Sequence, residues 1–323
     1  MTTTDPAAKQ GRWRLSKRGK GEVDQERDYR VMSPPTRRNL VGWSFIIPAA
    51  ALIAIMSFYP MFKALILSFK TGRANAMAFA DPWYYNYARL FEDPVFKLTL
   101  VNTFIYLIIQ VPIMLFLALI LANLLNNPNL KWKAFWRTSI FLPAAVSLVS
   151  YSLVFRTLFS TEGTVNTVLK NFGLISSNID WLGNPGTARA VIIIGLLWRW
   201  TGYNMIFYLA ALQNVDPATL EAARIDGAGP IKTFWYVTIP QLKPMIVLTA
   251  IMSTNGTLQL FDETFNLTRG GPANTTMSMS QYLYQVSFQG SPNLGYGAAI
   301  SFAILLMVAV LALIQMKVGD KRD

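Results

Sequence analysis

Six runs of apolar residues alternate with polar segments along the chain, near residues 42–67, 98–123, 135–158, 189–212, 244–266 and 295–316. Each run is long enough for a helix across the apolar core of a bilayer, which takes about 20 residues. A backbone in lipid must satisfy its own hydrogen bonds, and a helix does this within one segment. The pattern therefore predicts an all-α polytopic membrane protein with about six transmembrane helices.

Composition agrees with a membrane protein and excludes several kinds of active site. Of the 323 residues, 53% are hydrophobic and 14% are charged, and the mean hydropathy is +0.33. The chain has no cysteine and no histidine. Disulfides, thiolate zinc sites, histidine metal ligands and histidine-based catalytic triads are thus excluded. We expect no catalytic site and no metal site, and therefore a protein that is not an enzyme.

The first 40 residues are polar and basic, with ten Lys or Arg against five acidic residues. This composition predicts a disordered cytoplasmic tail that sets topology and attracts anionic lipid head groups. A nucleic-acid-binding arm is the alternative, although we expect no nucleic-acid partner. The tail is too long and too charged for a signal peptide. Residues 41–318 are predicted to form one membrane domain, and 319–323 a short second tail.

The basic residues also predict the orientation, because Lys and Arg are enriched on the cytoplasmic side. With both termini cytoplasmic, the inner segments are 1–40, 124–134 with Arg137, 213–243 and 317–323, and they hold 19 Lys or Arg against eight outside. Without the tail the numbers are nine and eight, so the tail carries most of this argument.

The polar segment 213–243 has the signals of a short helix followed by a tight turn. Asp216 before Pro217 predicts a helix start, since aspartate caps free amides and proline suits the first helical position. The helix is expected to run from Pro217 to Asp226. Gly227 can then adopt the left-handed conformation that ends a helix.

A second short helix is predicted to start at Pro230 and to be stopped by Pro240 and Pro244. One face of it would carry Ile231, Phe234, Trp235 and Thr238. Helices of about ten residues are marginal alone in water, so the pair requires a surface to dock on. An ordinary cytoplasmic loop is the alternative.

Three charged residues fall within the predicted spans, where charge is costly: Arg199, Asp262 and Glu263. Counted from the span ends, all three lie in the outer half of their helices. We expect Arg199 to pair with Asp262 or Glu263 between the fourth and fifth spans. The same residues could line a polar path through the membrane, and the two roles are compatible.

The fifth span is unusually polar, and the fourth carries polar and aromatic residues beside it. The fifth contains Thr249, Ser253, Thr254, Asn255, Gly256, Thr257 and Gln259; the fourth contains Trp200, Tyr203 and Asn204. Such a face should meet other helices or a water-filled cavity. Donors and acceptors next to aromatic rings suit a sugar. Close packing of helices by small polar residues is the alternative.

Several motifs together resemble the membrane subunits of binding-protein-dependent ABC importers. The polar segment 213–243 resembles their EAA loop in Glu221-Ala222-Ala223, Asp226-Gly227-Ala228-Gly229 and Ile239-Pro240. Further marks resemble the sugar-importer branch: Asn102-Thr103, Phe141-Leu142-Pro143 and Leu267-Thr268-Arg269-Gly270-Gly271-Pro272. The resemblance covers roughly residues 40–318.

The resemblance implies half of a sugar pathway in a bacterial inner membrane, coupled to a separate ATPase. The implied coupling residues are Glu221, Ala222, Ala223, Asp226, Gly227 and Pro240. The implied sugar contacts are Tyr203, Ser253, Thr257 and Leu260. The polar and aromatic residues of the fourth span add Trp200 and Asn204. The implied partners are a second permease, in a heterodimer that could hold most ligand contacts, two ATPase subunits and an extracytoplasmic sugar-binding protein.

ATP and Mg²⁺ would bind the ATPase, and we expect no cofactor on this chain. The stretch Gly227–Thr233 lacks the glycine that precedes the lysine of a phosphate loop. A stand-alone ion-coupled carrier using the three intramembrane charges is the alternative function.

The predicted outer segment 68–97 is rich in aromatic residues, namely Trp83, Tyr84, Tyr85 and Tyr87. They suit either the membrane interface or contact with the binding protein.

Overall fold

The computed structural model describes residues 35–73 and 76–319, in two units that divide between Met61 and Phe62. The first helix, α1 (Pro35–Ile53), continues through a π-helical turn, η1 (Ala54–Phe58), into α2 (Tyr59–Ser68), and the first unit ends within α2. The helix begins at Pro35, so residues 35–40, which were predicted to belong to the tail, are helical. Proline suits a first turn because its missing amide would have no partner there. Residues 1–34 and 320–323, which hold the rest of the two predicted tails, lie outside the described residues.

The second unit contains four long helices and one bent pair. The long helices are α4 (Pro94–Asn126), α8 (Pro185–Leu212), the continuous helix Pro230–Leu258 and α14 (Leu294–Gly319). The bent pair is α5 (Lys133–Ala145) and α6 (Leu148–Leu158), which meet at 97°. With Val41–Ser68, the described residues hold five helices that could span a membrane, or six if the pair counts as one. The predicted number of about six is confirmed.

Helix starts follow the local sequence. The Asp93 side chain accepts hydrogen bonds from the amides of Val95 and Phe96, and Pro94 occupies the first turn of α4. Asn184 accepts from the Gly186 amide in the same way at the start of α8. Both starts combine a capping side chain with a proline.

The predicted stop at Pro240 and Pro244 is wrong. Helix α10 (Pro230–Thr233) continues through a π-helical turn, η2 (Phe234–Thr238), into α11 (Ile239–Leu258), with Pro240 in its first turn. A proline ring normally clashes with the carbonyl four residues earlier. The wider π turn directly before Pro240 changes that spacing, so the helix passes the proline. Another π-helical turn precedes Pro60 in the first unit.

The fifth span also ends earlier than predicted. Helix α11 stops at Leu258, and after a short break a separate helix, α12 (Asp262–Thr268), begins. Asp262 and Glu263 therefore lie in the first turn of a short helix, where its dipole favours negative charge. They do not lie inside a spanning helix.

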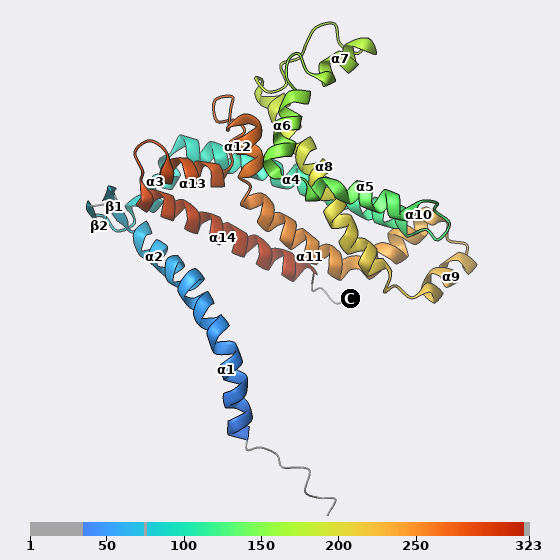
Figure 1. Ribbon diagram of the computed structural model, residues 1–323, viewed down its shortest axis with the longest axis horizontal. Helices are drawn as coiled ribbons and strands as arrows, with labels where there is room; N and C mark the ends of the chain where they lie inside the picture. The colour runs from blue at the N-terminus through green and yellow to red at the C-terminus, as the bar shows by residue number, and fades with distance from the viewer. Residues whose placement is uncertain (1–34, 74–75, 320–323) are drawn as a thin grey trace, which may run out of the picture. The chain divides into compact units, whose positions relative to one another are not determined.

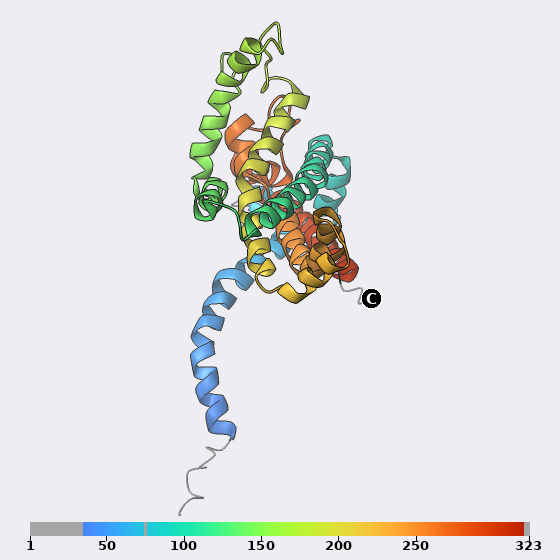
Figure 2. The same ribbon diagram turned by 90° about the vertical axis from the view of Figure 1, so that its right-hand side faces the viewer.

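Short elements connect the spans, and among them is a two-stranded hairpin that the apolar pattern did not predict. Strands β1 (Lys70–Arg73) and β2 (Ala76–Phe79) are antiparallel, with Lys70 opposite Phe79. The remaining short helices are α3 (Tyr85–Glu92), α7 (Thr164–Asn171), α9 (Pro217–Ile225) and α13 (Met279–Phe288). Within the second unit, α9 and α10 lie at one end, and α3, α13 and the hairpin lie at the other (Figures 1 and 2).

The core lies where α4, α8 and α11 pack together. Its buried side chains include Met114 and Ala118 of α4, Met205 and Tyr208 of α8, and Leu242 of α11. The Tyr208 hydroxyl shares a hydrogen bond of 2.7 Å with Thr249. Thr249, Thr254 and Thr257 of the fifth span are thus buried, as predicted, whereas Asn255 and Gln259 are exposed.

Candidate functional site

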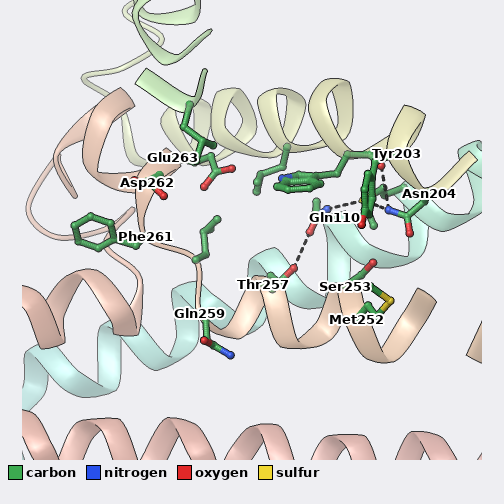
Figure 3. A pocket seen from close by; sticks show the side chains of 16 residues that line it. Gln110, Tyr203, Asn204, Met252, Ser253, Thr257, Gln259, Phe261, Asp262 and Glu263 are labelled. Carbon is green, nitrogen blue, oxygen red and sulfur yellow. Dashed lines mark hydrogen bonds between the residues drawn. The ribbon is translucent and has the colours of Figure 1, made fainter. Parts of the chain in front are cut away.

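A cavity of about 340 Å³ lies between α4, α8, α11 and the break before α12 (Figure 3). Its lining includes every residue predicted for the substrate path: Trp200, Tyr203, Asn204, Ser253, Thr257 and Leu260. Tyr203 and Asn204 come from α8, and Ser253 and Thr257 come from α11 on the opposite side. The fold therefore brings these six residues together around one space.

Helix α4 also contributes to this cavity, which the pattern of polar residues did not predict. Gln110 and Met114 complete its wall. Gln110 is buried within a helix that is otherwise strongly apolar. A lone amide in an apolar run was the available signal, since buried polar side chains in a membrane require partners.

The polar side chains of the cavity form hydrogen bonds with one another and with the Met114 sulfur, and a ligand could replace some of these partners. Thr257 donates to Gln110 Oε1 at 3.1 Å, and Gln110 donates to the Met114 sulfur at 3.1 Å. Asn204 donates to the Trp200 carbonyl at 3.0 Å and to the same sulfur at 3.6 Å. A thioether is a weak acceptor. A ligand hydroxyl would therefore be a better partner for both amides than Met114.

Aromatic rings form the apolar part of the lining. Trp200 meets Tyr203 edge-on with ring centroids 5.7 Å apart, and Phe261 lines the end next to Asp262 and Glu263. Rings beside amides, hydroxyls and carboxylates suit a ligand with apolar ring faces and many hydroxyls.

The predicted ion pair of Arg199 is wrong. Its guanidinium donates to the carbonyls of Pro143 at 3.3 Å, Ala144 at 3.3 Å and Val146 at 2.6 Å. No ion pair joins it to Asp262 or Glu263, all three being among the described residues. Of these carbonyls, that of Pro143 also accepts from the Val146 amide at 3.3 Å. The last carbonyls of a helix have no partner within it, and a cation is favourable at a helix C-terminus.

Arg199 therefore holds the bend between α5 and α6, and it does not line the cavity, whereas Asp262 and Glu263 do. The close approach of α5 and α8 explains Gly202, where a Cβ would lie 1.9 Å from the Ile140 carbonyl oxygen. The Phe141–Pro143 motif thus lies at a tight crossing of α5 and α8.

The Asn102-Thr103 motif bonds to the segment that follows the Leu267–Pro272 motif, in one hydrogen-bonded network that we call the outer lock (Asn102, Thr103, Arg189 and residues 274–279). Asn102 is fully buried and donates to the carbonyls of Asn274 and Met277, each at 3.0 Å. Arg189 donates to Asn102 Oδ1 at 2.9 Å and to the Thr275 carbonyl at 2.8 Å. Thr103 accepts from the Met279 amide at 3.1 Å.

The outer lock reaches the cavity through Ser278. Its hydroxyl donates to the carbonyl of Leu260, which lines the cavity, and also contacts Thr264 at 3.3 Å. The loop after α12 is thus tied on one side to α4 and α8, and on the other to the break that forms the cavity wall.

The predicted helix–turn–helix lies at the opposite end of the second unit. Helix α9 runs from Pro217 to Ile225, and Asp216 Oδ1 accepts from the Ala218 amide at 2.9 Å. Gly227 has φ of +77°, and the Ala228 amide donates to the Ala223 carbonyl at 2.9 Å. Both the cap and the left-handed turn match the prediction.

This end exposes apolar side chains. Ile225 is 86% exposed, Ile231 76% and Tyr236 80%, and Glu221 and Ala222 are exposed beside them. The predicted common face is only partly correct. Thr238 is buried and Trp235 stacks on Phe116 at 6.2 Å, because the π turn shifts these residues relative to Ile231.

The aromatic segment before α4 is partly exposed and partly packed. Trp83, Tyr84 and Tyr85 are exposed, whereas Tyr87 shares a hydrogen bond of 2.8 Å with Ser68. The three exposed rings are compatible with both the interfacial role and contact with a protein.

Asp93, which caps the start of α4, has a pKa below its ordinary value. Burial alone would raise its pKa, but hydrogen bonds from Tyr282, Tyr296 and the amides of Phe96 and Val95 outweigh burial and lower its pKa. This carboxylate joins α4, α13 and α14. Among residues 35–73 and 76–319, no group of three acidic side chains could hold a metal ion.

Comparison with known proteins identifies the family. The family model described as binding-protein-dependent transport system inner membrane component matches residues 95–319. The chain belongs to this family. The predicted resemblance to permease subunits of ABC sugar importers is confirmed, and the protein is a multi-pass inner-membrane component.

Its relatives include sugar permeases. The chain is 50% identical over 283 residues to the lactose transport system permease protein of Rhizobium radiobacter, covering 87% of this chain and 94% of the relative. It is 33% identical to the arabinooligosaccharides transport system permease protein of Halalkalibacterium halodurans, covering 94% and 96%. A bacterial ABC transporter for alginate import has the same fold, with a TM-score of 0.77 at 22% identity, covering 88% and 96%.

Proposed function

We propose that this chain forms half of the pathway for a di- or oligosaccharide across a bacterial inner membrane, with the cavity as its sugar site. The observation that carries the proposal is the cavity lining, where amides, hydroxyls and aromatic rings from three helices converge. The lactose permease relative, at 50% identity, makes lactose the first sugar to test.

We further propose that the exposed helix–turn–helix docks on a separate ATPase subunit, which binds ATP and Mg²⁺. Its exposed Ile225, Ile231 and Tyr236 would gain from burial against a protein partner. This orientation puts α9 and α10, and with them both termini, on the cytoplasmic side. The other end then faces a sugar-binding protein. A bacterial alginate ABC transporter of similar fold has been crystallised in complex with a periplasmic protein that carries an alginate pentasaccharide.

In this mechanism the chain contributes binding and geometry, and the ATPase contributes the energy. ATP and the loaded binding protein favour one arrangement of two permease halves over the other, so their binding shifts the population between inward-open and outward-open states. Sugar bound by Gln110, Asn204 and Thr257 is released as the cavity changes shape.

The test is reconstitution in proteoliposomes. The chain alone should neither hydrolyse ATP nor take up lactose, whereas the complex with a second permease, two ATPase copies and the binding protein should do both. Lactose uptake by the lone chain, driven by an ion gradient, would instead establish the carrier alternative.

The site itself is tested by Thr257→Val, which keeps the side-chain size but removes the hydroxyl that contacts Gln110. Losing one hydrogen bond should raise KM for lactose about three- to tenfold without affecting assembly. Thr167→Val, on α7 away from the cavity, is the matched control. An unchanged KM in both variants would place the site on the partner permease.

A further inference from the structure

The exposed face of α13 combines aromatic rings with amides, next to the cavity. We call this face the α13 strip, and it consists of Tyr284, Gln285, Phe288 and Gln289. Tyr284 is 36% exposed and Phe288 66% exposed, and both glutamines are exposed. Phe288 lies four residues and therefore about 6 Å beyond Tyr284 along the helix axis, and Gln289 follows it as the extended residue at the C-terminus of the helix.

The α13 strip is continuous with the cavity through a chain of touching rings. Phe261 lines the cavity, and its ring lies 5.2 Å from Tyr284 and 5.2 Å from Phe265. Tyr284 in turn lies 5.6 Å from Phe288. An apolar surface with polar groups at regular intervals thus runs from the cavity to exposed residues, and Phe261 marks its starting point in Figure 3.

We propose that the α13 strip binds the sugar rings of an oligosaccharide that extend beyond the cavity. The cavity volume of about 340 Å³ is near the lower end of the range for small-molecule sites, about 300–1,000 Å³. A longer sugar chain must therefore continue outside it. Aromatic rings stack on the apolar faces of sugars, and the glutamine amides can bond their hydroxyls.

A lipid-facing surface does not explain the α13 strip. In hydrocarbon, exposed amides are unfavourable, and lipid-facing helices avoid them. Helix α13 has ten residues, too few to span a bilayer. The position of the strip, contiguous with the cavity through Phe261, favours sugar as its occupant over a protein surface.

This inference rests on the proposed function and deepens it, since it assigns oligosaccharides longer than two rings to the substrate class. The experiment compares uptake of lactose and of the trisaccharide galactosyl-lactose by the full complex in proteoliposomes. The variants are Tyr284→Ala and Phe288→Ala. The matched control is Phe91→Ala, which removes an exposed ring of α3 at the same end of the second unit.

We expect each strip variant to raise KM for galactosyl-lactose about three- to tenfold and to change KM for lactose less than twofold. The control should change neither value. Equal effects on both sugars, or no effect on either, would contradict a sugar-binding role of the α13 strip while leaving the proposed function in place. If the unsubstituted complex takes up neither sugar, the proposed function fails and the strip fails with it.

A second measurement separates sugar from protein as the occupant. The chain contains no cysteine, so Phe288→Cys introduces a single labelling site. In the full complex this cysteine should react with a membrane-impermeant maleimide, and galactosyl-lactose should slow the reaction while lactose does not. A cysteine that reacts before assembly but not in the complex would mean that a partner protein covers the strip, which would overturn the proposal.

Discussion

Replacing Asn102 should loosen the loop after α12, which adjoins the cavity, without changing any residue that lines the cavity. Asn102→Leu keeps a side chain of similar size but removes two donated hydrogen bonds, to the Asn274 and Met277 carbonyls, and one accepted from Arg189. Asn102 is fully buried, so the Met277 carbonyl loses its side-chain partner away from water, whereas the Asn274 carbonyl still accepts from the Met277 amide.

The magnitude follows from those groups. A buried polar group left without a partner costs about 1–3 kcal/mol. Arg189 is only partly buried and can recover a partner from water, and the Asn274 carbonyl keeps its hydrogen bond from the Met277 amide at 3.2 Å, so the Met277 carbonyl dominates. With the lost bond to Asn274 added, the expected loss is about 1.5–4 kcal/mol in the free energy of unfolding.

The assay is a denaturant titration of the purified chain in mixed micelles, followed by circular dichroism. Asn171→Leu, on the exposed end of α7, is the matched control and should change the free energy by less than about 0.5 kcal/mol. If Asn102→Leu lies within about 1 kcal/mol of the unsubstituted chain, the outer lock does not hold the loop after α12.

Two further predictions concern the two ends of the second unit. Gly227→Val forces a β-branched residue into φ of +77° with no contact within 4 Å of the new Cβ, so it should leave membrane insertion intact and uncouple ATP hydrolysis from uptake; normal uptake would contradict this. Because the pKa of Asp93 is lowered on folding, its stabilisation is complete above the unfolded pKa of about 3.9 and is lost as pH falls through the lower folded value. Tyr282→Phe should reduce that acid-dependent loss in a thermal melt, whereas Tyr236→Phe, an exposed control, should not.

The apolar pattern predicted the spans well because span length and hydropathy are local properties of the chain. The capping residues Asp216 and Gly227 also act locally, and α9 and its turn formed as predicted. The six residues predicted for the path lie around one cavity because polar side chains on neighbouring apolar helices have few other places to go.

The breaks in the helices could not be predicted in the same way. The bend after Ala145 is held by Arg199, which is more than fifty residues away and donates to three carbonyls at the bend. The break after Leu258 contains no proline or glycine, and it depends on Ser278, which bonds the Leu260 carbonyl. Both breaks are stabilised by tertiary contacts, so intrinsic propensity does not reveal them.

At Pro240 the sequence predicted a break that the structure does not have, and the continuous helix affects how the protein could work. A helix that stopped there would separate the helix–turn–helix from the cavity by a flexible joint. Instead one helix runs from Pro230 to Leu258, about 44 Å at 1.5 Å per residue. It begins in the helix–turn–helix and carries Ser253 and Thr257 near its other end. Within this helix the only departure from α-helical geometry is the π turn at Phe234–Thr238. A displacement of the helix–turn–helix by the proposed ATPase partner would therefore reach Ser253 and Thr257 through a single rigid body.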